Sequence, residues 1–137
     1  MKETAAMRRV YSEIQYKLFK MIPEEFHRMY LYCSITEQLE GKPIGEMYFY
    51  YFPKGLLKRN PVNVYEIPDK FNIDDEKYSR LINDLYQSFL ELRLQFTLSN
   101  QDVWTNLTMK IENLNAFKDF LVKLFSCLDY NKISKKS

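Results

Sequence analysis

DDEKYSRLINDLYQSFLELRLQFTLS, residues 74–99, is the stretch of this chain that decides the fold. Its large apolar residues recur at steps of three and four, so they fall on one stripe of a helix. They are Tyr78, Leu81, Ile82, Leu85, Phe89, Leu92 and Phe96. Asp74 is placed to cap the first turn, and Asp75 and Glu76 suit the positive end of the helix dipole. Such a helix needs an apolar partner surface, because packing stabilises it far more than propensity does.

Composition predicts one soluble, folded domain over residues 1–137. The chain is 46% hydrophobic and 28% charged, which excludes an intrinsically disordered protein. It holds 11 Tyr and 10 Phe against 3 Gly, and this aromatic excess favours a sheet. No apolar run of membrane-spanning length and no signal-peptide pattern is present, so we expect a cytoplasmic protein without a membrane partner.

Residue types that carry catalysis or bind metals are scarce. Cys33 and Cys127 are the two cysteines, and each stands alone in an apolar context, which predicts free thiols that pack in the fold. His27 is the single histidine, so neither a histidine-assisted nucleophile nor a His-rich metal site is favoured. No glycine-rich phosphate loop occurs. The sequence therefore predicts a non-enzymatic protein with no metal and no cofactor.

Charge is distributed unevenly around a net charge of +2. Residues 61–115 carry nine Asp and Glu against five Lys and Arg, whereas both flanking regions are basic. The acidic region at residues 61–115 indicates either a solvated helix face or a surface for a basic partner. Since no element concentrates Lys and Arg between aromatics, we expect no nucleic-acid partner.

The rest of the chain predicts a helix and antiparallel strands. A helical stripe runs over residues 3–21, and Pro23 lies just beyond its end. Alternation of apolar and polar residues then marks strands at residues 28–35, 46–53, 61–65 and 103–112. The first two strands form a hairpin, and we expect the helices to cover one face of the sheet. The fold class is α+β, with a sheet of about four strands.

Aromatic side chains alternate on the two hairpin strands. Tyr48, Tyr50 and Phe52 fall on the face opposite Met47, Phe49 and Tyr51, and tyrosines of the preceding strand join them. Such a patch indicates either cross-strand pairs or a binding surface. Trp104 is the single tryptophan, and its setting fits a surface anchor for a partner as well as half-buried packing.

Five separated segments closely resemble the YezG-like immunity proteins in order and spacing. They are MIPEEF at 21–26, MYLYCSI at 29–35, MYFYYFP at 47–53, IPDKFNIDDEKY at 67–78 and QDVWTNLTMKIE at 101–112. The resemblance spans roughly residues 7–112. It implies an α+β fold, no catalysis and binding to a secreted nuclease toxin inside the producing cell.

The resemblance does not continue through the C-terminal segment, residues 116–137. Family members usually continue with a strand of alternating aromatic and acidic residues, whereas apolar residues here follow a helical stripe. That stripe comprises Phe117, Phe120, Leu121, Leu124, Phe125 and Leu128. We therefore expect a C-terminal helix and a divergent segment over residues 116–137, through truncation, a reading-frame change or genuine divergence.

The expected partner is a cognate toxin, whose basic nuclease cleft would attract acidic side chains in place of phosphates. The acidic candidates for this contact are Asp69, Asp74, Asp75, Glu76 and Asp102, and the aromatic candidates are Trp104, Tyr48 and Tyr50. Two other classes stay open. One is an adaptor that self-associates through the tyrosine-rich face, and the other is a nucleic-acid binder that stacks bases on it. The sequence leaves the oligomeric state open.

Overall fold

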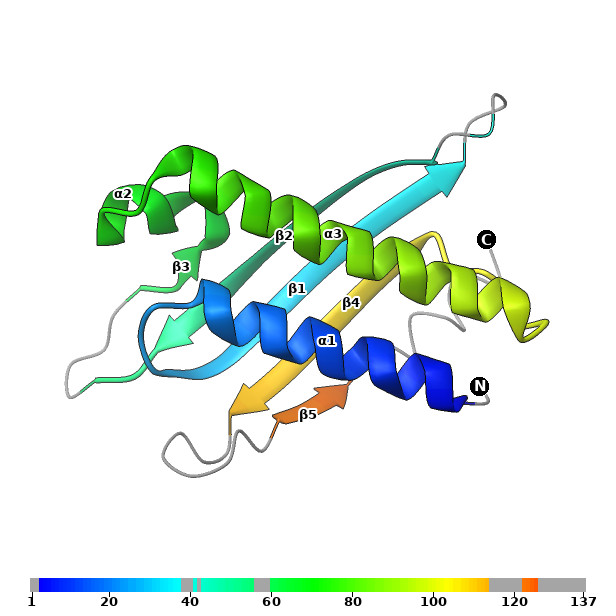
Figure 1. Ribbon diagram of the computed structural model, residues 1–137. Coiled ribbons are helices and arrows are strands. Elements are labelled where there is room, and N and C mark those ends of the chain that lie inside the picture. Colours follow the sequence, from blue (N-terminus) through cyan, green and yellow to red (C-terminus); the bar gives the residue numbers. More distant parts are fainter. Residues whose placement is uncertain (1–2, 38–40, 42, 56–59, 114–121, 126–137) are drawn as a thin grey trace.

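The protein is a two-layer α+β structure in which helices cover one face of an antiparallel sheet (Figure 1). A computed structural model describes residues 3–37, 41, 43–55, 60–113 and 122–125. Its elements, in chain order, are α1 (Ala5–Met21), β1 (Phe26–Glu37), β2 (Pro43–Pro53), β3 (Val62–Asn63), a 3-10 helix (Val64–Glu66), α2 (Ile67–Phe71), α3 (Asp75–Leu98), β4 (Asn106–Asn113) and β5 (Val122–Phe125). The strand order is β3-β2-β1-β4-β5.

The predicted long helix is confirmed as α3. Asp74 caps it, because its carboxylate accepts a hydrogen bond from the backbone N–H of Lys77 at 2.9 Å. Most of the predicted stripe is buried, and Leu81 and Ile82 are partly buried at its edge. The fully buried members are Tyr78, Leu85, Phe89, Leu92 and Phe96. The stripe therefore forms the layer between helix and sheet.

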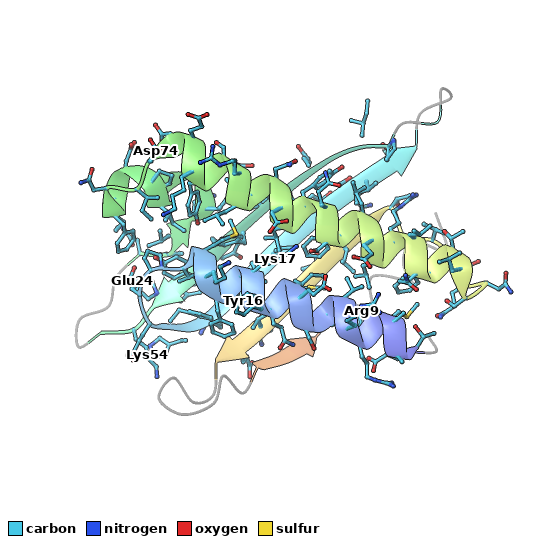
Figure 2. The ribbon with its side chains drawn as sticks, in the orientation of Figure 1. Arg9, Tyr16, Lys17, Glu24, Lys54 and Asp74 are labelled. Atoms are coloured by element: carbon cyan, nitrogen blue, oxygen red, sulfur yellow. The ribbon has the colours of Figure 1, made fainter. Side chains whose placement is uncertain are left out.

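The N-terminal helix α1 lies beside α3 on the same face of the sheet (Figure 1). Lys17 joins the two helices, since its Nζ donates to Ser88 Oγ at 2.7 Å and to Asp84 Oδ1 at 3.3 Å; Figure 2 shows Lys17 between them. Tyr78 Oη donates to the carbonyl of Met21 at 2.9 Å, satisfying a terminal acceptor of α1. Polar contacts thus fix how the two apolar stripes lie over the sheet.

The sheet alternates as the sequence predicts. In the β1–β2 hairpin Tyr30 is opposite Tyr50 and Tyr32 is opposite Tyr48, and β4 pairs with the other side of β1. The residues between these positions point towards the helices and are buried. They are Met29, Leu31, Cys33, Ile35, Met47, Phe49, Tyr51, Leu107, Met109 and Ile111.

Two elements differ from the prediction after the hairpin. The third strand is limited to Val62–Asn63, because Asn63 caps a 3-10 helix through its side-chain contact with the N–H of Tyr65. The short helix α2, which the sequence did not predict, follows, and Pro68 lies in its first turn, a position where its missing N–H costs nothing. Both changes shorten the pairing available to β2.

The expected C-terminal helix is wrong for residues Val122–Phe125. These residues form β5, which pairs antiparallel with β4 from Lys110 to Asn113. An open edge of β4 offers a ladder of backbone hydrogen bonds, and this tertiary pairing outweighs a local helical pattern. The remaining positions of the predicted helical stripe lie outside the described residues, as does Cys127.

Cys33 is expected to be chemically inert in the folded protein. Its side chain is fully buried on β1, and burial raises the pKa of its thiol from 9.0 to about 12. In a Cys127→Ser variant at pH 8, Ellman's reagent should modify Cys33 about a thousandfold more slowly in the native chain than in urea. Fast native modification would contradict this placement.

The same burial gives a pH dependence. Above pH 9 the unfolded chain releases the thiol proton while the folded chain keeps it, so this group's contribution lowers stability as pH rises from 9.0 towards about 12. Below pH 9 both states hold the proton and the contribution is constant. Replacing Cys33 with alanine should remove this part of the alkaline loss, measured by urea unfolding across that range.

Candidate partner-binding surfaces

Four of the acidic candidates lie together where α2 meets α3. Asp69 is on α2, Asp74 caps α3, and Asp75 and Glu76 occupy its first turn; all four are exposed. We call these four residues the acidic corner, and Figure 2 marks its position with Asp74. Asp74 also caps α3, and Glu76 forms a surface ion pair with Arg80 at 3.7 Å. Exposed carboxylates at this position are available to a partner.

Asp102 is not part of the acidic corner. It is exposed in the connection between α3 and β4, at the opposite end of a helix of 24 residues. At 1.5 Å per residue that helix spans about 36 Å. The five acidic candidates are therefore split between two ends of the helical layer.

Tyr48 and Tyr50 lie on the sheet face that is turned away from α1 and α3. Tyr50 stacks on Tyr30 with ring centroids 5.5 Å apart, and Tyr48 packs against Tyr32 at 6.0 Å. Tyr32 Oη donates to Asn106 Oδ1 at 2.9 Å, which holds its ring in place. Tyr48 stays 40% exposed, whereas Tyr50 is half-buried. Cross-strand pairing thus accounts for much of this patch, as one of the two readings predicts.

A shallow concavity of about 250 Å³ lies on this face. Its lining residues are Tyr30, Leu31, Tyr32, Tyr48, Tyr50 and Thr108. At one end of the patch the guanidinium of Arg28 lies 4.1 Å from the centre of the Phe52 ring. The face thus presents aromatic rings with Arg28 at its margin.

Of the two readings that the sequence left open for Trp104, the surface anchor is wrong. Its side chain is fully buried, and its backbone carbonyl accepts a hydrogen bond from Arg93 Nε at 3.1 Å. Within the described residues the indole N–H has no hydrogen-bond partner. Strand β4 begins only at Asn106, so the alternation of the strand does not govern residue 104. In this structure Trp104 belongs to the core and cannot act as an exposed anchor.

The outer edge of β2 is a surface that the sequence did not single out. Beside it lies a concavity of about 330 Å³ formed by β2, the 3-10 helix and α3. Its lining residues are Gly45, Glu46, Met47, Tyr65, Ser79, Ile82, Asn83 and Tyr86. A Cβ at Gly45 would collide with the backbone oxygen of Ser34 and meet Tyr86 Oη at 2.7 Å, so glycine lets α3 approach the strand. The sequence feature that could have indicated this open edge is the contrast between a long second strand and a short third strand.

Searches for metal-binding and membrane-spanning features gave no candidate. Among residues 3–37, 41, 43–55, 60–113 and 122–125, no three His, Cys, Asp or Glu side chains gather as ligands for an ion. No helix in that part of the chain is both long enough and apolar enough to cross a bilayer.

Comparison with known proteins identifies the family. The fold defines a two-layer α+β protein, and the family model described as "Immunity protein YezG-like" matches residues 7–136. Immunity protein YezG of Bacillus spizizenii is 32% identical over 129 residues, which cover 94% of this chain and 70% of that protein. The chain therefore belongs to the YezG-like immunity protein family, as the five segments predict. The family match continues through residues 116–136, where the sequence resemblance was expected to end.

Two further relatives extend this comparison. Immunity protein YezG of Bacillus subtilis strain 168 is 30% identical over 130 residues, covering 91% of this chain and 72% of that protein. Type VII secretion system protein EsaG of Staphylococcus aureus is 32% identical over 99 residues, covering 72% of this chain and 56% of that protein. The similarity thus reaches a protein named for a secretion system.

Proposed function

We propose that this protein binds and neutralises a cognate secreted nuclease toxin in the cytoplasm of the cell that produces both. The observation that carries the proposal is the immunity-family match over residues 7–136. A relative named as a type VII secretion system protein supports a secreted partner. Immunity requires a complex with the toxin before the toxin leaves or harms its producer, and the exposed surfaces described above supply places for such a complex.

The acidic corner is the first surface we assign to the toxin. A nuclease cleft is basic because it binds phosphates, and carboxylates at this corner can take the place of those phosphates. Asp75 and Glu76 are exposed on the first turn of α3, so they can contact a partner without breaking a buried interaction. Complementary charge also steers association and raises its rate. Asp102 and the Tyr48–Tyr50 face remain separate candidates for contact.

Reversing three charges of the acidic corner should slow toxin binding. In the Asp74→Lys/Asp75→Lys/Glu76→Lys variant, we expect the association rate to fall roughly tenfold or more at low salt, with a smaller difference at high salt. Surface plasmon resonance against a catalytically inactive form of the cognate toxin measures both rates. The lost Asp74 cap should cost only about 1 kcal/mol of stability.

A matched control separates local charge from net charge. Glu3→Lys/Glu13→Lys/Glu25→Lys makes the same change in net charge at positions just before α1, on α1 and just before β1. This control should associate nearly as fast as wild type. A corner variant that also binds like wild type would remove the acidic corner from the interface and leave the tyrosine face as the next candidate. Absence of any complex with the wild-type chain would count against the proposed function itself.

A further inference from the structure

Half of strand β2 has an open outer edge. β2 runs from Pro43 to Pro53, yet its pairing with β3 involves only Tyr50 and Tyr51. Residues 43–49 pair with β1 on one side, and no described strand lies on the other (Figure 1). Open edges of this length are uncommon in stable proteins, because they attract another extended chain.

A side-chain hydrogen bond shows which backbone groups point outward. Tyr65 Oη donates to the carbonyl of Met47 at 3.0 Å, so Met47 directs its backbone polar groups away from β1. Backbone direction repeats every second residue in a strand, and Gly45 therefore points the same way. The N–H and C=O of Gly45 and the N–H of Met47 therefore point to the side of β2 where β3 pairs only with Tyr50 and Tyr51. These three groups form an unfilled segment of β-ladder.

The concavity beside this edge provides room for a side chain. Ser79 and Asn83 line it from α3, and both residues are exposed. Tyr65, 63% exposed, closes one end, and Ile44, 57% exposed, lies at the other end of the open edge. An added strand would place every second side chain towards this concavity.

Charge indicates what kind of segment fits. Glu46 is exposed on the open half of β2, and Ser79 lies one helical turn beyond Asp75 and Glu76 of the acidic corner. The edge is therefore continuous with an acidic surface. A second copy of this chain paired across the same edge would bring two Glu46 side chains together, and like charges in facing positions are destabilising.

We propose that an extended, basic segment of the toxin adds to the outer edge of β2 as a further strand. Its backbone hydrogen-bonds to Gly45 and Met47, one side chain enters the concavity at Ser79 and Asn83, and its basic side chains face Glu46 and the acidic corner. Strand addition is an established way for a sheet edge to bind a peptide, with the backbone giving affinity and the adjacent pocket giving specificity. The inference rests on the proposed function and names the surface that performs it.

Filling the concavity tests the proposal. Ser79→Arg/Asn83→Arg adds bulk and positive charge beside the edge, and Gln87→Arg/Leu94→Arg adds the same charge at exposed positions of α3 outside the concavity. Against the inactive form of the cognate toxin, we expect the first variant to lose at least tenfold in affinity and the control to stay within twofold of wild type. Equal affinity of both variants would overturn the assignment of this edge.

Amide hydrogen exchange on the wild-type chain gives a second readout that does not depend on a variant. In the free protein the amides of Gly45 and Met47 should exchange quickly, while those of Glu46 and Tyr48, which face β1, exchange slowly. Toxin binding should slow Gly45 and Met47 to the level of their neighbours. Protection that appears elsewhere and leaves these two amides fast would overturn the edge proposal while supporting the proposed function. Failure of the wild-type chain to bind at all would overturn both.

Discussion

Replacing Phe89 with alanine is expected to lower the free energy of unfolding by about 3–5 kcal/mol. Phe89 is fully buried in the middle of α3, where the helix layer packs on the sheet. Truncation removes the apolar area of the ring and leaves a cavity that the surrounding core fills only in part. Equilibrium unfolding in urea measures the loss directly.

A control on the same helix isolates the effect of burial. Leu94→Ala also truncates a large apolar side chain of α3, but Leu94 is 51% exposed. Its cost should stay within about 1 kcal/mol, since exposed positions contribute little packing. If Phe89→Ala cost no more than this control, the central helix would not pack on the sheet as described.

Long periodic segments were the part of the fold that the sequence predicted well. The stripe of α3 and the alternation of β1, β2 and β4 each repeat over many residues, so an isolated exception does not change the assignment. The alternation also predicts which side chains share a face of the sheet, and Met47 and Tyr48 lie on opposite sides of β2 as expected. The Asp74 cap was also predictable, because its carboxylate acts within the same turn.

The failures arose where tertiary contacts decide the structure. Trp104 lies between Asn100, which adopts a left-handed φ of 57°, and the start of β4 at Asn106. The alternation of the strand therefore could not decide between the two readings of Trp104. At Val122–Phe125 the edge of β4 determines a strand, and no local pattern reports that edge. The concavity beside β2 is lined by residues that are far apart in the sequence. A local sequence pattern therefore could not predict it.

The candidate site was predictable only in its clusters of neighbouring residues. Asp74, Asp75 and Glu76 are adjacent in sequence and stay together at one corner, joined by Asp69 through the short helix α2. Asp102 resembled them in charge but lies beyond the far end of α3. Charge patterning therefore located one acidic surface and gave no information on how far the remaining candidate lies from it.

Survival of cells that produce the toxin tests the central claim most directly. The chain is co-expressed with the active form of its cognate toxin, and colonies are counted with and without it; an inactivated toxin shows that killing requires toxin activity. Because an immunity protein protects by occupying the toxin, the wild-type chain should restore colony numbers by several orders of magnitude and co-purify with the toxin. The Phe89→Ala variant should protect less, since fewer molecules are folded. Colony numbers that stay as low with the wild-type chain as without it, while both proteins accumulate, would contradict the account.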